Sequence, residues 1–179
     1  MIPSIATASG IEFWPLDPRP EDIQIEDIAH ALSQQCRFAG HTKQFYSVAE
    51  HCVRAADLVP EEHALVALLH DASEAYLVDL PSPVKHQMPD YVEAESRMQK
   101  AIYRWAGISV DQENAAREHV KAADELLLRL EQRDLMPQCD WWPALLLPKH
   151  PRITPWDSWD ARNRFLDCWH SLIEGAEGF

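Results

Sequence analysis

Glycine is scarce in this chain, which has only 5 glycines among 179 residues. They stand at positions 10, 40, 107, 175 and 178, and none of them makes a G-x-G or a P-loop spacing. Glycines at those spacings let the backbone approach the phosphates of a dinucleotide or a nucleoside triphosphate. The sequence therefore excludes Rossmann-type dinucleotide binding and Walker-type phosphate binding.

Positive charge is also in short supply. The chain has 16 Lys and Arg residues against 29 Asp and Glu residues, which gives a formal net charge of −13. An acidic surface repels the phosphate backbone that provides most of the non-specific affinity for nucleic acids. We therefore expect a small molecule, and no DNA or RNA polymer, as the partner of this protein.

Long apolar runs and paired cysteines are missing as well. No window approaches 18 uninterrupted apolar residues, and the N-terminal segment has no basic stretch ahead of an apolar one. The four cysteines, at positions 36, 52, 139 and 168, form no C-x-x-C pair and are too sparse for a disulfide scaffold. We expect a cytoplasmic protein with reduced thiols, without a signal peptide and without membrane contact.

Helical periodicity dominates what is present. Apolar residues recur at three and four positions and nowhere sustain a period of two. Together with a length typical of one compact domain, this predicts a single all-α domain over residues 1–179, a bundle of about six helices. The expected helices cover residues 25–34, 48–59, 61–76, 90–106, 111–134 and 156–174. Residues 1–21 should form an extended or turning entry segment.

A proline- and tryptophan-rich stretch, residues 137–155, separates the last two expected helices. Its five prolines are too many for a regular element, so we expect a packed loop before the last helix. Trp141 and Trp142 in this stretch either cover core or subunit surface, or wall a ligand pocket.

Two polar residues lie on apolar helical stripes. His51 falls on the stripe of the helix expected over residues 48–59 and should point inward. Taken alone, a core histidine bonded to a backbone carbonyl explains it. Asp124 lies between Val120 and Leu127 on the stripe of another helix, where an unpaired carboxylate would cost several kcal/mol. A salt bridge to Arg or Lys would explain Asp124 alone.

A third polar group interrupts the apolar pattern of the helix expected over residues 61–76. At about 100° per residue, His70, Asp71 and Glu74 fall within an arc of about 100° and can meet at one point above that helix. Two carboxylates and an imidazole cannot be buried there without a cation or several donors. With the polar residues of the other two helices, they form a set that suits a divalent metal with water in its remaining positions.

Four short motifs resemble those of the HD-domain phosphohydrolase superfamily. They are S-V-A-E-H at 47–51, H-D-A-S-E at 70–74, D-L-P-S-P-V-K at 79–85 and V-K-A-A-D at 120–124. Their combination looks most like the bacterial 5′-deoxynucleotidase branch, and the phage enzymes that remove triphosphate from dATP look similar. The resemblance covers residues 36–131 and implies an all-α HD-domain fold.

The resemblance also implies roles for individual residues. It implies one divalent ion, either cobalt, manganese, zinc or a similar transition metal, or magnesium, held by His51, His70, Asp71 and Asp124. It implies two catalytic carboxylates, Glu74 and Asp79, that orient the attacking water or protonate the leaving oxygen. It implies substrate contacts from three cations and from one aromatic ring that could stack on base or sugar, namely Arg37, Lys85, Lys121 and Phe38.

The activity that this resemblance implies most directly is a 5′-deoxynucleotidase, which releases phosphate from deoxynucleoside monophosphates. One alternative is a deoxynucleoside triphosphate triphosphohydrolase, and a guanosine tetraphosphate hydrolase is disfavoured because D-L-P-x-P-x-K fits the deoxynucleotidase branch better. Another alternative is a catalytically silent, nucleotide-binding regulatory domain, against which the presence of Glu74 and Asp79 argues. We also expect a homo-oligomer, a dimer or higher.

Overall fold

The computed structural model of the chain describes residues 3–139 and 149–176. In that part, eight α-helices follow one another: α1 Ile25–Gln34, α2 Val48–Ala56, α3 Glu61–Leu68, α4 Glu74–Leu77, α5 Ser82–Lys85, α6 Pro89–Trp105, α7 Val110–Leu135 and α8 Ser158–Ala176. There are also two short 3₁₀ helices, η1 Pro20–Asp22 and η2 Phe38–Gly40, and two paired antiparallel strands, β1 Ile5–Ala6 and β2 Glu12–Phe13. The prediction of an all-α bundle is confirmed. The shortest elements were not predicted, because two to four residues show no periodicity.

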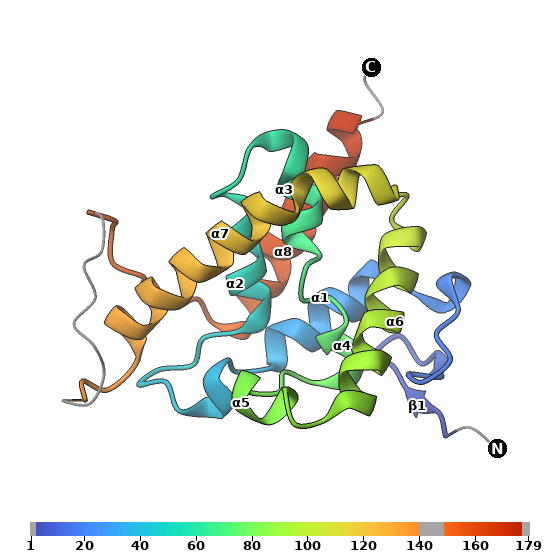
Figure 1. Cartoon of the computed structure of the whole chain (residues 1–179), viewed down its shortest axis with the longest axis horizontal. Helices are drawn as coiled ribbons and strands as arrows, with labels where there is room; N and C mark the ends of the chain where they lie inside the picture. The colour runs from blue at the N-terminus through green and yellow to red at the C-terminus, as the bar shows by residue number, and fades with distance from the viewer. Residues whose placement is uncertain (1–2, 140–148, 177–179) are drawn as a thin grey trace.

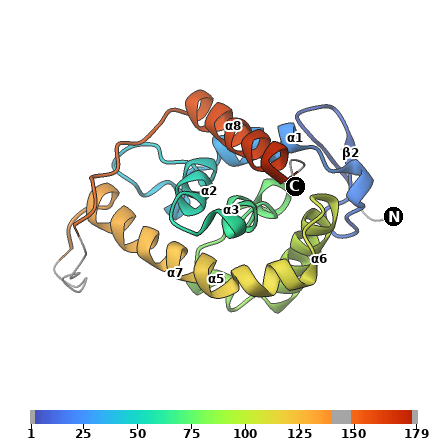
Figure 2. The same cartoon turned by 90° about the horizontal axis from the view of Figure 1, so that it is seen from above.

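The long helices form three layers, which Figure 2 shows from above. Helices α2 and α3 lie in the middle, α8 and α1 cover one side, and α7 covers the other. Figure 1 shows α7 crossing in front of α2 and α3, with α6 running down beside the bundle from the start of α7. Any side chain that leaves α2 or α3 towards α7 therefore lies between two layers.

Most of the core lies between α1, α2, α3 and α8. Leu32, Cys52, Leu68 and Phe165, one from each of these helices, are fully buried in a single apolar cluster. A smaller apolar cluster joins α2 to α7 through Ala55, Leu127 and Leu130. The apolar stripe predicted for the long helix therefore docks α7 against α2, and this contact fixes the position of the polar residues on the same stripe.

The N-termini of α2 and α7 are capped by serine side chains. Ser47 Oγ accepts a hydrogen bond from Glu50 N at 3.1 Å, which satisfies one of the free N–H groups of the first turn. Glu50 does not complete a capping box, because its carboxylate binds Arg54 and the backbone of Trp156 instead. Helix α2 ends at Ala56, three residues before the expected end. A full capping box starts α7 at Ser109.

The prediction of a single helix over residues 61–76 is wrong. Helix α3 ends at Leu68, and α4 begins only at Glu74. Between them the backbone forms tighter turns, in which Glu74 N donates to Asp71 O across three residues at 3.0 Å. The helical arc from which we inferred that His70, Asp71 and Glu74 meet therefore does not exist, and other contacts must bring these residues together.

The proline-rich stretch is described in part. Residues 137–139 and 149–155 contain no helix or strand, in agreement with the expected loop, whereas Trp141 and Trp142 lie outside the described residues. None of the described helices combines the length and the apolar character that crossing a membrane requires.

Candidate metal centre

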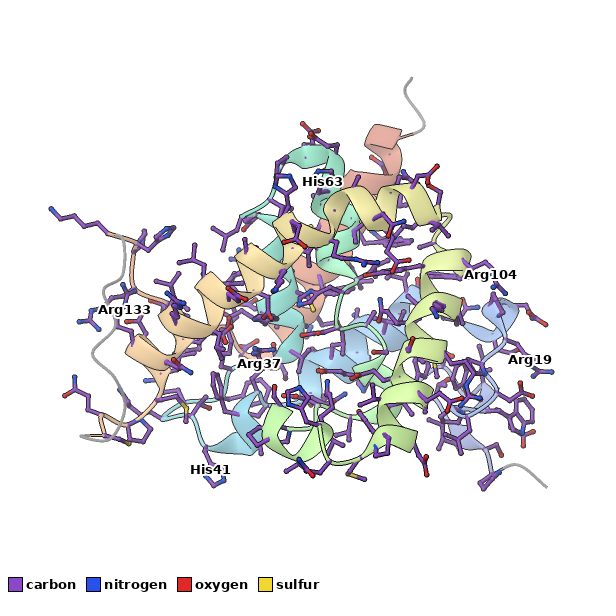
Figure 3. The ribbon with its side chains drawn as sticks, viewed as in Figure 1. Arg19, Arg37, His41, His63, Arg104 and Arg133 are labelled. Atoms are coloured by element: carbon purple, nitrogen blue, oxygen red, sulfur yellow. The ribbon has the colours of Figure 1, made fainter. Side chains whose placement is uncertain are left out.

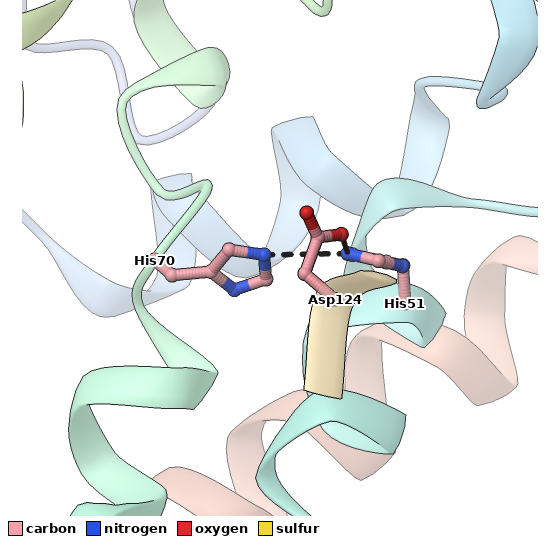
Figure 4. A group of neighbouring side chains, drawn as sticks. All are labelled: His51, His70 and Asp124. Carbon is pink, nitrogen blue, oxygen red and sulfur yellow. Dashed lines mark hydrogen bonds and ion pairs between the residues drawn. The ribbon is translucent and has the colours of Figure 1, made fainter. Parts of the chain in front are cut away.

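Side chains from three segments meet between the middle layer and α7. His51 comes from α2, His70 from the turn after α3, and Asp124 from α7, as Figure 4 shows. His51 Nε2 lies 3.3 Å from His70 Nε2 and 3.2 Å from Asp124 Oδ1. The fourth predicted ligand joins them, because Asp71 Oδ2 lies 3.3 Å from His70 Nε2 and 3.6 Å from His51 Nε2. The structure therefore brings together all four residues that the sequence proposed as metal ligands.

These separations suit one shared cation. Donor atoms that bind the same ion at about 2.1 Å lie about 3 to 3.5 Å from one another. In both histidines Nδ1 is already engaged, since His51 Nδ1 lies 2.7 Å from a carboxylate oxygen of Glu131 and His70 Nδ1 lies 2.7 Å from Ala67 O. In the neutral rings the two Nε2 lone pairs then face each other, which requires a proton or a metal ion between them. The donor set therefore fits a divalent metal.

A neighbouring thiol is less suited to the same ion. Cys52, His70 and Asp71 also place one donor atom each within 4.8 Å of one another. Burial raises the pKa of the Cys52 thiol well above its usual value, which disfavours the thiolate that a metal would bind. We therefore assign the nitrogen and oxygen donors, rather than Cys52, to the site.

Glu131 supports the site from α7, and the sequence analysis did not single it out. Its Oε1 accepts a hydrogen bond from His51 Nδ1 at 2.7 Å and from Tyr46 Oη at 2.9 Å, while its Oε2 accepts one from Arg37 Nε at 3.3 Å. A signal was available, because Glu131 follows Asp124 by seven residues, two helical turns, and so continues the same stripe.

The charges of this cluster compensate one another. Burial raises the pKa of Glu131, but the charges of His51 and Arg37 and two hydrogen bonds outweigh it and lower the pKa to about 2. Burial and Arg37 depress the pKa of His51, but Glu131 and Asp124 outweigh them and raise it to about 9. Contact with His51 likewise holds the pKa of Asp124 below its usual range, against the effect of burial. In the absence of a metal, a protonated His51 provides the positive charge between these carboxylates.

The turn that carries His70 and Asp71 is held by a side chain of α6. Gln99 Nε2 donates to Leu69 O at 2.6 Å, and Ser73 N donates to Gln99 Oε1 at 3.1 Å. These bonds give Ser73 N an acceptor and give Leu69 O a second donor beside Ala72 N, at the point where the helix is interrupted. A glutamine amide thus replaces helical hydrogen bonds on both sides of the two predicted ligands.

A second glutamine holds the segment of the two predicted catalytic carboxylates. Gln35 Nε2 donates to Glu74 O at 2.9 Å, and Asp79 N donates to Gln35 Oε1 at 3.1 Å. Burial raises the pKa of Asp79, while the charges of Arg37 and Lys85 oppose this. Nothing in the sequence pattern marks these glutamines, because Gln35 directly follows the end of α1 and Gln99 lies within α6, and a glutamine is ordinary at either place.

Glu74 is buried beside this cluster with an incomplete set of partners. Its Oε1 lies 3.6 Å from Lys85 Nζ, and its Oε2 has no hydrogen-bond partner among the described residues. Burial, reinforced by the negative charges of Asp71 and Asp79, raises the pKa of Glu74 to about 9. Glu74 therefore carries a proton at neutral pH.

The predicted substrate-binding residues lie around the four ligands. Figure 3 shows Arg37 near the middle of the molecule, whereas the other labelled arginines lie towards its edges. An Nη atom of Arg37 lies 3.4 Å from Asp71 Oδ2, and its guanidinium lies 5.8 Å from the ring centre of Phe38, which is half-buried. Lys85 Nζ forms an ion pair with Glu95 at 2.6 Å.

Two pockets open beside His70. One, of about 250 Å³, is lined by Asp71, Lys85 and Gln99 among others. The other, of about 280 Å³, is lined by residues of α3, α6 and α7, including Lys121 and Asp124. The side chain of Asp124 is 45% exposed. The structure therefore places Lys85 and Lys121 in different pockets that share His70.

Comparisons with known proteins match most of the chain to other bacterial sequences. No family model matches the chain. It is 43% identical over 142 residues to the uncharacterized protein YfdR of Escherichia coli, and this match covers 79% of this chain and 78% of YfdR. It is 38% identical over 137 residues to an uncharacterized protein of Rhodobacter capsulatus, and this match covers 71% of this chain and 70% of that protein.

A shorter similarity reaches proteins with a named activity. Over 85 residues the chain is 38% identical to a 5′-deoxynucleotidase of Erwinia tasmaniensis. This match covers 42% of the chain and 35% of that protein, so it relates only part of each sequence.

Proposed function

The chain belongs to the family of the Escherichia coli protein YfdR, and we propose that it is a metal-dependent phosphohydrolase that releases phosphate from deoxynucleoside monophosphates. The convergence of two imidazoles and two carboxylates from three separate segments carries this proposal. The partial similarity to a protein named 5′-deoxynucleotidase supports the choice of substrate class.

The four converging residues, His51, His70, Asp71 and Asp124, would hold one divalent ion. Two imidazole donors favour a transition metal such as zinc, cobalt or manganese over magnesium, which prefers oxygen donors. When bound, the ion would supply a Lewis acid for hydrolysis of the phosphate ester.

The cations beside these ligands would bind and orient the phosphate. Arg37 is anchored to Glu131 through Nε, and one of its terminal nitrogens reaches Asp71 Oδ2 at 3.4 Å. A guanidinium held in this way can present parallel N–H donors to a phosphate. Lys85 lines the pocket next to Asp71 and adds a second positive charge, and Phe38 offers a ring for stacking on base or sugar.

The two carboxylates would divide the proton transfers between them. Glu74 is protonated at neutral pH, because burial raises its pKa to about 9, so it suits the general acid that gives a proton to the leaving 5′-oxygen. Asp79 is held through its backbone by Gln35 and lies near enough to Arg37 to sense its charge. We assign to Asp79 the orientation of the attacking water.

One observation favours triphosphate release as a second candidate function. Arg117 and Lys121 lie one turn apart on α7, in the turns that precede Asp124, and line the same pocket as Asp124. Within residues 3–139 and 149–176, no carboxylate lies within ion-pair distance of either cation, although Glu113 also lines this pocket. Arg117 donates to the neutral Asn114 Oδ1 at 3.0 Å, so its charge is not compensated by that contact. Two such cations on the helix that carries Asp124 could neutralise a chain of phosphates.

The released anion distinguishes the two functions. The chain loaded with Co²⁺ or Mn²⁺ would be incubated with dAMP, AMP, dATP and ATP, and the products identified by ion chromatography. We expect phosphate from dAMP, about 10- to 100-fold faster than from AMP, because a pocket that crowds the sugar leaves a 2′-hydroxyl unpaired.

Release of intact triphosphate from dATP, with little action on dAMP, would replace this proposal by the second candidate. In that case Arg117→Ala should slow the reaction of dATP. Equal rates on AMP and dAMP, and on ATP and dATP, would contradict the selectivity for deoxyribose. Nucleotide binding without hydrolysis of any of the four would favour a regulatory domain.

A further inference from the structure

Glu131 is a fully buried carboxylate with hydrogen bonds to a predicted metal ligand and to a predicted substrate contact. Its Oε1 accepts from His51 Nδ1 and Tyr46 Oη, and its Oε2 accepts from Arg37 Nε. Burying an ionised carboxylate is costly unless donors fill its lone pairs. Three donors from outside α7 meet this requirement, so the carboxylate is held in one orientation.

We propose that Glu131 is a positioning residue that fixes His51 with the lone pair of Nε2 directed at the metal. This inference rests on the proposed function, because it assumes that a metal binds at the site. A carboxylate that accepts from Nδ1–H keeps the proton on that nitrogen and leaves Nε2 as the donor atom in the neutral ring. Nε2 of His51 is the atom that lies 3.3 Å from His70 Nε2 and 3.2 Å from Asp124 Oδ1.

The spacing on α7 explains why a single helix can do this. Asp124 and Glu131 are seven residues apart, so they lie two turns apart on the same face of α7. Asp124 contacts Nε2 of the His51 ring and Glu131 contacts Nδ1. The imidazole is therefore held at both nitrogens by one rigid element, and its orientation follows from the docking of α7 on α2.

The same carboxylate also orients a predicted substrate contact. Arg37 donates to Glu131 Oε2 through Nε at 3.3 Å and reaches Asp71 Oδ2 with an Nη atom at 3.4 Å. Without the charge of Glu131, the interaction that holds the near end of the Arg37 guanidinium would be weaker. Loss of this charge should therefore weaken both metal and phosphate binding.

Glu50 provides a matched control within the same chain. It is also fully buried and precedes His51 directly. Its Oε1 accepts from Arg54 at 2.9 and 2.7 Å, and its Oε2 accepts from Trp156 N at 2.8 Å, so none of its hydrogen bonds involves His51. Glu50→Gln thus removes a buried charge without altering a contact of the metal centre.

The test compares metal binding in three proteins. Titration calorimetry with Zn²⁺ and with Mn²⁺ would be run at one pH on the wild type, Glu131→Gln and Glu50→Gln. We expect Glu131→Gln to bind each ion about 10- to 100-fold more weakly, as is usual when a partner of a ligating histidine is lost. Glu50→Gln should lower the Tm of the metal-free protein but keep the metal affinity within about twofold of the wild type.

A spectroscopic readout follows the imidazole itself. In the Zn²⁺-loaded wild type, long-range ¹H–¹⁵N spectra should show the Nδ1–H tautomer of His51. In Glu131→Gln the amide can donate to Nδ1, so this tautomer should be lost in part. Glu131→Asp, which keeps the charge on a shorter side chain, should recover part of the metal affinity. If Glu131→Gln does not fold, the wild-type spectrum and Glu131→Asp still decide the question.

Several outcomes would overturn the inference. The first is a Glu131→Gln protein that binds metal as tightly as the wild type. The second is an Nε2–H tautomer of His51 in the Zn²⁺-loaded wild type. The third is an equal loss of metal affinity in Glu50→Gln, which would indicate a general effect of removing a buried charge. A wild type that binds Zn²⁺ with the expected tautomer but hydrolyses no deoxynucleotide would overturn the proposed function and support this inference. A wild type that binds neither ion would overturn both.

Discussion

The candidate metal centre consists of a helical half, His51 on α2 with Asp124 and Glu131 on α7, and a turn half, His70 and Asp71 between α3 and α4. In the helical half, each side chain leaves a helix whose backbone hydrogen bonds are internal, and the docking of α7 on α2 sets the distances. In the turn half, the helix has ended, and the backbone is held by one side chain from elsewhere in the chain, Gln99 of α6.

This difference shows two ways of placing ligands at a comparable distance from one point. A regular helix positions residues through its own geometry, so spacings of three, four and seven suffice. An irregular turn needs outside donors and acceptors for its exposed backbone groups, and these can come from any part of the chain. The turn half should therefore be more sensitive to changes far from it in sequence.

The largest effect is expected from removing one ligand charge in either half. Asp124→Asn and Asp71→Asn should each lower metal affinity and activity by more than about 100-fold, exceeding the cost usual for residues that only support a ligand. Metal content would be measured by elemental analysis, with Asp134→Asn as the control. Asp134 also lies on α7, but it pairs with Arg133 and Arg152 and with none of the four predicted ligands.

The two halves should respond alike in this experiment, because both contribute to one ion. The metal-bound wild type should also unfold at a higher temperature than either variant, since binding to the native state stabilises it. Full metal occupancy in both variants would contradict the ligand assignment, and a loss in only one would show that the halves do not act together.

The next largest effect separates proton transfer from metal binding. Glu74→Gln keeps the shape of the side chain but removes its ability to donate a proton, so activity should fall by about 100-fold or more while the metal stays bound. The control is Glu93→Gln, because Glu93 is 77% exposed on α6 and pairs with Arg97 of the same helix. Near-normal turnover of Glu74→Gln would reduce Glu74 to a structural role.

The same variant should change how stability depends on pH. The pKa of Glu74 is raised from 4.5 to about 9 in the folded protein, so folding favours the protonated form. Its contribution to the free energy of unfolding is complete below about pH 4.5 and is lost as the pH rises towards 9. Urea unfolding of the metal-free protein should show a smaller decrease between pH 5 and 9 in Glu74→Gln, and parallel profiles would contradict the raised pKa.

The sequence was informative where periodicity and backbone agree. Helix α1 was predicted at its observed bounds, and α6 and α7 were predicted to within one residue at each end. Over residues 61–76 the apolar stripe continues through the interruption, so the pattern gives no sign that the backbone leaves the α-helix at Leu68. Hydrogen bonds from Gln99 make that interruption possible, and no spacing rule reveals them.

The residues of the site, like the helices, could be predicted where they follow a helical spacing. His51 and Asp124 were inferred from their positions on apolar stripes, and the structure brings them to 3.2 Å from each other. His70 and Asp71 do join them, but the helical arc from which this was inferred is absent, whereas the motif resemblance indicates the same two residues without it. Glu131 had the seven-residue spacing in its favour but was overlooked, because a glutamate near the end of a long helix is usually solvated.

The smallest effect expected is also the most direct test of the difference between the halves. Gln99→Ala leaves Ser73 N without its acceptor and removes one of the two donors to Leu69 O, and it should lower the free energy of unfolding by about 1 to 3 kcal/mol. Metal affinity should fall by about 10-fold, because the turn that carries His70 and Asp71 loosens.

The control for Gln99→Ala acts on the helical half. Ser109→Ala removes the capping box of α7, which should lower the free energy of unfolding by about 1 kcal/mol. Asp124 lies 15 residues further along a continuous helix, so its position should not depend on this cap and metal affinity should stay unchanged. Urea unfolding and metal titration of both variants would be compared. If the two lose stability but bind metal equally well, the turn half keeps its geometry without Gln99, and the contrast between the halves fails.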